Sequence, residues 1–268
     1  MREITLTEDE KERAKSSAEY NEKQLRRKYD QEYFEEIPDE KVPTVLFGKA
    51  LDHEFLAKYS LFEGKIEQAR EHFQQYIEAF VQNCEKVVVT DGVEGGIVLV
   101  PLKLRNALYA ALILEDETEI ERLTTKILDL PREVEFPWEG VDEMIAFDEE
   151  EYHQAKIIAM LVRGETEDLS SHLDVTNELR EEKDGLAARY LTGIDTFANG
   201  ILEEDEATIE AGITTTLNAH HNDTHQHEKR DIEGLMMSLE ATGHYKLAHR
   251  HGFDVRLDSP YIPDSVHE

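Results

Sequence analysis

Histidine is concentrated in one short segment of the chain. His220, His221, His225 and His227 lie within eight residues of one another. On a helix, His221 and His225 would share a face, which is the arrangement that two ligands of a zinc ion require. The candidate metal ligands are therefore His221, His225 and His227. A further ligand would have to come from elsewhere, for example from one of four residues: His153, His172, Asp223 or Glu228.

The same histidines also have a simpler interpretation. The His-Glu-x-x-His pattern that is typical of zinc hydrolases is absent from the sequence. A helix that ends near His220 and continues as a solvated polar loop explains the segment without a ligand. We therefore expect no metal and no cofactor, and a histidine-dependent metal hydrolase is a minor alternative.

The other residue types that could do chemistry form no catalytic set. With 60 Asp and Glu residues in the chain, no pair of carboxylates stands out as an acid and base. Cys84 falls on the apolar side of an expected helix, which predicts a buried small side chain. Residues 91–96 are rich in glycine but lack the lysine of a phosphate-binding loop. Ser259 lies outside any strand-to-helix turn that could present it as a nucleophile. The sequence thus favours a protein that binds a partner without catalysis.

The charge of the chain is strongly negative. The 60 acidic residues oppose 29 Lys and Arg, for a formal net charge of −31. The acids occur in nearly every segment, whereas a patch for a basic partner would be local. This distribution favours a salt-loving cell, where molar salt reduces the Debye length to about 3 Å and screens the repulsion. It also argues against nucleic-acid binding, which relies on clustered Lys and Arg.

Adaptation to salt predicts a measurable response. The melting temperature should rise steeply between dilute buffer and molar KCl, because the added ions screen repulsion among the surface carboxylates. Thermal unfolding at a series of KCl concentrations measures this. A flat response would instead favour a basic partner as the reason for the acidity.

The sequence predicts a cytoplasmic protein that does not cross a membrane. Residues 1–10 carry acids where a secretory signal would carry basic and then apolar residues. The longest apolar region, residues 97–114, contains Pro101, Lys103 and Arg105 and would cross a bilayer only at high cost. The single cysteine, Cys84, fits a reducing compartment.

Apolar residues recur every three or four positions, which predicts a single all-α domain over residues 1–268. A capping box at Thr7–Glu10 begins a long N-terminal helix at about 8–35. Later breaks near four residues about 40 to 50 positions apart predict an array of antiparallel helical hairpins: Gly64, Asp116, Gly164 and Glu204. Residues 87–99 form either a small β-hairpin or a loop. A last helix that holds Leu235, Leu239 and Leu247 precedes an extended tail at 253–268.

Three segments near the C-terminus, 238–241, 247–255 and 258–263, resemble the end of the immunity 49 family, predicted all-helical immunity proteins of bacterial polymorphic toxin systems. The resemblance covers about 50 residues, and before roughly Ile209 only the helical pattern matches. It implies a protein without catalysis that binds a toxin encoded nearby and blocks its active site or its movement. The residues that it offers for partner binding are these four: His220, His221, Glu240 and Tyr261.

Two functions other than an immunity protein are open. The spacing of the hairpins is also typical of a tetratricopeptide-like scaffold, which would bind short peptides in a concave groove. The histidine segment would support the metal hydrolase. An ordered pocket in which several ionisable groups converge on a bound ion or small compound would contradict a protein that only binds.

Overall fold

The computed structural model describes residues 6–29, 36–89, 97–135, 144–225 and 231–267. Within these ranges the secondary structure is almost entirely helical, which confirms the all-α fold class. In chain order the helices are α1 (Glu8–Lys28), η1 (Asp39–Lys41), α3 (Val42–Phe62), α4 (Ile66–Val89), α6 (Val100–Leu114), α7 (Glu117–Leu128), α8 (Glu149–Arg163), α9 (Leu169–Glu182), α10 (Gly185–Glu203), α11 (Glu206–Thr224), α12 (Ile232–Met236), α13 (Leu239–Arg250) and η2 (Asp264–Val266).

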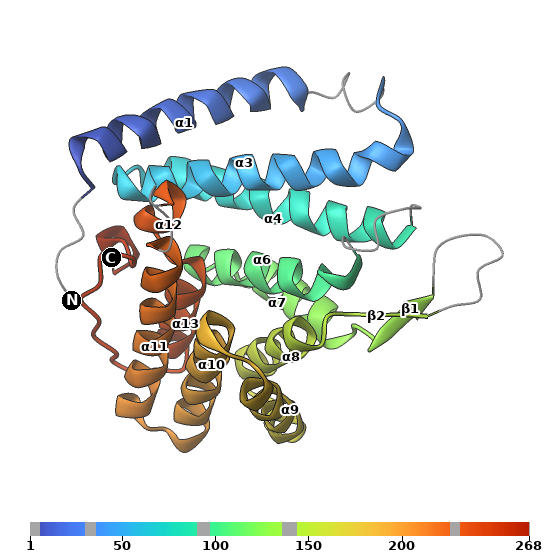
Figure 1. The fold of residues 1–268 in the computed structure, drawn as a ribbon, viewed down its shortest axis with the longest axis vertical. Helices are drawn as coiled ribbons and strands as arrows, with labels where there is room; N and C mark the ends of the chain where they lie inside the picture. Colours follow the sequence, from blue (N-terminus) through green and yellow to red (C-terminus); the bar gives the residue numbers. More distant parts are fainter. Residues whose placement is uncertain (1–5, 30–35, 90–96, 136–143, 226–230, 268) are drawn as a thin grey trace.

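Helices α1, α3, α4 and α6 lie side by side, and α10 and α11 run across their direction (Figure 1). The pairs α3 with α4, α6 with α7, α8 with α9 and α10 with α11 each pack together, and α1 lies along the outer side of α3. Helix α6 is central, because it contacts α4, α7, α8 and α13 and is buried over most of its length. The array of helical hairpins therefore surrounds α6.

The capping box at the start of α1 is confirmed. The Glu10 amide donates to Thr7 Oγ1 at 3.3 Å, and the Thr7 amide donates to Glu10 Oε2 at 2.9 Å. The helix ends at Lys28, before the expected end near residue 35, and Tyr29 has already left helical geometry. The fully buried apolar residues of α1 are the small Ala14 and Ala18, with Leu25 partly buried beside them, so little apolar surface supports a longer helix.

The breaks between hairpins lie where the sequence predicts them. Gly64 and Gly164 have φ of +71° and end α3 and α8. Glu115 and Glu204 occupy the same left-handed region, with φ of 54° and 52°, at the ends of α6 and α10. Glutamate pays a steric cost in this conformation that glycine avoids.

This geometry predicts a stabilising substitution. Glu204→Gly should raise the free energy of unfolding by about 1 kcal/mol, because glycine adopts the left-handed conformation without the Cβ clash. Glu203→Gly removes the same charge one residue earlier, inside α10, and should lower it by up to about 1 kcal/mol. Urea denaturation of both variants measures the difference. Equal effects of the two glycines would contradict the strain argument.

The larger of two apolar clusters runs from Ala50 of α3 to Val266 near the C-terminus, and the smaller one lies between α1, α3 and α12. Helices α10 and α11 pack closely, because a Cβ added to Gly212 would lie 2.4 Å from the backbone nitrogen of Phe197. The C-terminal tail closes the cluster, because Tyr261 and Ile262 are buried and the Ser238 amide donates to the Tyr261 carbonyl at 2.9 Å.

Two details differ from the sequence prediction. Residues 87–89 continue α4 and residues 97–98 are also helical, while the rest of the segment expected as a hairpin or loop, 90–96, lies outside the described residues. The short antiparallel pair of strands is instead β1 (Glu133–Glu135) with β2 (Met144–Ala146). The last helix is divided, because Met237 is extended between α12 and α13.

Within the described ranges, no helix is both long enough and apolar enough to cross a bilayer.

Candidate functional site

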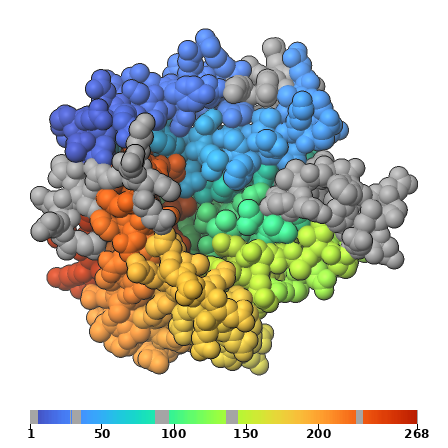
Figure 2. Space-filling model, in the orientation of Figure 1, coloured from blue at the N-terminus to red at the C-terminus, as the bar shows by residue number. Residues whose placement is uncertain are grey.

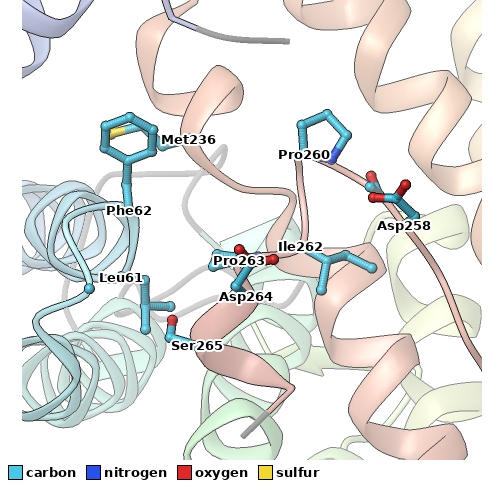
Figure 3. A pocket seen from close by; sticks show the side chains of 11 residues that line it. Leu61, Phe62, Met236, Asp258, Pro260, Ile262, Pro263, Asp264 and Ser265 are labelled. Carbon is cyan, nitrogen blue, oxygen red and sulfur yellow. The ribbon is translucent and has the colours of Figure 1, made fainter. Parts of the chain in front are cut away.

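A cavity of about 490 Å³ lies between the end of α3, α12 and the C-terminal tail (Figure 3). Leu61 and Phe62 line one side, and Pro260 lies on the tail. Its two carboxylates, Asp258 and Asp264, are exposed, and the described residues that line it include no buried charge. Water screens exposed charges strongly, so the two carboxylates of this cavity would attract a charged ligand only weakly.

A second cavity, of about 390 Å³, combines shape with buried charge. It is enclosed by α3, α6, α8, α10, α11 and residues 237–240, and Figure 2 shows the face where these elements meet, with α6 set back between α3 and α11. Two cations line it, Lys58 and Arg105. Five carboxylates line it as well: Glu54, Glu150, Glu151, Asp223 and Glu240. Because ionic groups attract more strongly where water is excluded, we take this cavity as the candidate site.

Arg105 is the buried cation on the α6 side of the cavity. Only 4% of the residue is exposed, and its Nη2 lies 3.0 Å from Glu151 Oε2 on α8. Nη1 donates to the Gln154 side-chain oxygen, while Nε has no hydrogen-bond partner among the described residues. Burial alone would lower the pKa of Arg105, but the Glu151 carboxylate raises it above its ordinary value. Arg105 therefore stays charged in the interior.

Glu240 faces Arg105 and Glu151 from the start of α13. The Ser238 hydroxyl caps this helix by accepting from the Ala241 amide at 3.3 Å, and this fixes the first turn in which Glu240 lies. The Glu240 Oε1 atom is buried and has no hydrogen-bond partner within the described residues. Burial raises the pKa of Glu240 to about 7, the Arg105 guanidinium opposes this, and Glu151 adds to it. The carboxyl group therefore titrates near neutral pH.

Lys58 forms the second ionic group of the cavity, on the α3 side. It is 7% exposed, and its Nζ lies 2.6 Å from Glu54 Oε1 and 2.7 Å from Glu233 Oε1. Burial would lower the pKa of Lys58, but the two carboxylates raise it above its ordinary value. Because Glu233 belongs to α12, this triad ties α12 to α3 beside the cavity that Lys58 and Glu54 line.

The four residues that the family resemblance offers for partner binding lie together. His220 and Glu240 line the cavity. The His220 Nε2 atom donates to the Gly234 carbonyl at 2.7 Å, and burial lowers the pKa of this histidine. His221 Nδ1 lies 2.7 Å from the Tyr261 hydroxyl, and the Tyr261 ring meets the His220 ring edge-on at 5.0 Å. Two of the four residues therefore line the cavity, and the other two pack behind His220 where the tail meets α11.

The model of the immunity protein 49 family matches residues 67–266, which include most of this architecture. The chain belongs to that family. No curated protein and no solved structure matches the chain.

The family match is longer than the sequence resemblance indicated. It begins at the start of α4 and ends in η2, so it includes every helix from α4 onward and is not confined to about 50 residues at the C-terminus. Within the cavity, Arg105, Glu151 and Glu240 lie inside the matched region, whereas Glu54 and Lys58 of α3 precede it. The Arg105 side of the cavity is thus formed by the part of the chain that carries the family assignment.

The candidate metal ligands are only partly brought together. The ring centroids of His221 and His225 lie 4.2 Å apart with the rings tilted, but His225 Nδ1 donates to the His221 carbonyl, and His227 lies outside the described residues. Residues His153 and His172 pair with each other between α8 and α9, with their Nδ1 atoms 2.8 Å apart. Among the described residues, no three His, Cys, Asp or Glu side chains are arranged to hold a metal ion.

Cys84 and Ser259 have structural surroundings. Cys84 is buried in the core cluster, as expected, and burial raises the pKa of its thiol to about 12. Ser259 is 7% exposed, and its hydroxyl accepts from the Tyr261 amide at 3.3 Å in the turn of the tail.

Sequence reasoning missed the ionic groups of the cavity. Lys58, Arg105 and Glu151 were not singled out as functional residues. The sequence does indicate that Arg105 needs an acidic partner. A cation within the apolar helix of residues 100–114 must be paired when that helix is buried on all sides. Its partner could not be chosen from the sequence, since many acids are available.

Proposed function

We propose that this chain is an immunity protein that neutralises a partner toxin by binding it, in the cytoplasm of the cell that makes both. The match of the immunity protein 49 family over residues 67–266 is the observation that carries this proposal. An array of helical hairpins suits the role, because it presents an extended, rigid surface to a second protein.

The cavity is consistent with binding and gives no support to covalent catalysis. Its two cations are held in ion pairs, Arg105 with Glu151 and Lys58 with Glu54. Covalent catalysis requires a nucleophile that is hydrogen-bonded to a base. Among the described residues that line the cavity, the hydroxyl of Ser238 accepts from a backbone amide and is not so paired.

The test is co-expression with candidate toxins. Genes that adjoin the gene for this chain are expressed in a susceptible bacterial host, with this chain or with an unrelated acidic helical protein. We expect one neighbouring product to stop growth, this chain alone to restore it, and the two proteins to purify as a complex. Toxicity that persists with this chain present, without a complex with any neighbouring product, would refute the proposal.

A further inference from the structure

The ion pairs of the cavity leave its carboxylates in excess. Lys58 is engaged by Glu54 and Glu233, and the described cation that pairs with Glu150 is Lys183. The remaining cation that lines the cavity, Arg105, forms its ion pair with Glu151. Glu240 makes no ion pair with a described residue, although it is next to this cluster.

Atoms that face the cavity also lack hydrogen-bond partners. Oε1 of Glu240 is a buried acceptor without a hydrogen-bond partner among the described residues. Oε2 of Glu151 lies 3.0 Å from Nη2 of Arg105, a residue that is only 4% exposed. A buried carboxylate oxygen without a donor costs free energy. A ligand that brings several N–H donors and a positive charge would remove this cost at Glu240 and could donate to the neighbouring Glu151 as well.

The cavity can admit such a ligand from solvent. Asp223, which lines it at the end of α11, is exposed, so this side of the cavity reaches the surface. Its volume of about 390 Å³ is enough for one long side chain. A guanidinium group has five N–H donors in a plane and can bridge two carboxylates, whereas an ammonium group acts as a point charge.

We propose that this cavity receives the guanidinium group of one arginine side chain of the partner toxin, with Glu240 and Glu151 as its acceptors. This inference rests on the proposed function. The acidic cavity and the cationic side chain are complementary in charge, and water exclusion makes their attraction stronger than that of exposed surface carboxylates. The contact would therefore also persist at salt concentrations that screen the surface.

The first experiment uses a small probe and does not depend on the toxin. Purified full-length protein is titrated by calorimetry with N-acetyl-arginine amide and with N-acetyl-citrulline amide, in which an uncharged urea replaces the guanidinium. We expect the arginine probe to bind at least roughly tenfold more tightly, and Glu240→Gln to abolish this preference. Glu133→Gln, at an exposed position of β1, should behave as the wild type.

The pH dependence of binding distinguishes a direct contact of Glu240 with the arginine probe from a structural role. Burial raises the pKa of Glu240 to about 7, and the charged groups that act on it are Arg105, Glu151 and Glu150. A cation binds the ionised carboxylate, so affinity for the arginine probe should rise between pH 6 and 8 and then level off. Glu240→Gln should remove that rise. Equal binding of the two probes, or a Glu240→Gln variant that binds like the wild type, would overturn the inference.

The second experiment separates this inference from the proposed function. The affinity of the co-purified toxin is measured for the wild type, Glu240→Gln and Glu133→Gln, after circular dichroism shows equal folding. We expect Glu240→Gln to weaken the complex by roughly ten- to a hundredfold and Glu133→Gln to leave it unchanged. Toxin that binds the wild type and Glu240→Gln equally would overturn the arginine site and leave the proposed function intact. If no toxin binds the wild type, the proposed function fails and the probe titration alone decides the site.

Discussion

Replacement of Lys58 by methionine is expected to lower the free energy of unfolding by about 3 to 5 kcal/mol, because it leaves two inward-facing carboxylates without their cation. The Lys58 ammonium lies within 2.7 Å of both Glu54 and Glu233, and only 7% of the residue is exposed. The loss should shrink at acidic pH, where the carboxylates can be neutralised by protons. Chemical denaturation at pH 7 and at pH 5 measures both effects.

Two further variants make the Lys58 prediction specific. The triple variant Lys58→Met, Glu54→Gln, Glu233→Gln should recover most of the lost stability, because it removes the uncompensated charges together with the cation. Lys11→Met is the matched control, since Lys11 pairs with Glu8 at the exposed start of α1 and should change stability by less than about 1 kcal/mol. A loss in Lys58→Met that is no larger than the loss in Lys11→Met would contradict the importance of the triad.

The helical array could be predicted from the sequence because its signals are local. Apolar stripes mark each helix, and the left-handed residues at Gly64, Gly164 and Glu204 lie where those stripes are interrupted. The strands β1 and β2 could not be predicted, since three residues each are too few to show alternation. The valines at 87–89 favour a strand by propensity, but they continue a helix whose apolar face is already buried against α3 and α6.

The candidate site was predictable only in part, because it depends on contacts between distant segments. His220 and Glu240 were reached through the family resemblance. Arg105 and Glu151 are 46 positions apart in the sequence, and only the packing of α6 against α8 brings them together. With 60 acids in the chain, no local pattern distinguishes the few that turn inward.

Several histidines are held neutral by the interior, and this predicts how stability depends on pH. Burial lowers the pKa of His244 to about 3 and that of His53 to about 3. An unfolded histidine takes up a proton near pH 6.5. The unfolded chain therefore binds more protons than the folded chain below that pH, so these residues favour unfolding as the pH falls from 6.5 toward 3. Glu240 acts in the opposite sense, because its pKa in the folded chain is raised to about 7. Its contribution to the stability of the folded chain is lost as the pH rises from 4.5 through 7.

The contribution of His244 can be isolated by replacing it with phenylalanine. Its ring stacks on Phe197 at 4.5 Å, and its Nε2 lies 3.0 Å from the Tyr109 hydroxyl, in a position without exposure to solvent. The lost hydrogen bond should change stability equally at every pH. On lowering the pH from 7.5 to 5, His244→Phe should lose about 2 kcal/mol less stability than the wild type, because it no longer carries a group that only the unfolded chain protonates. Urea denaturation across this range measures the slopes, and His249→Phe at an exposed position of α13 controls for removal of an imidazole. Parallel slopes for His244→Phe and the wild type would mean that His244 is protonated within the fold, and that the interior around Tyr109 admits a charge.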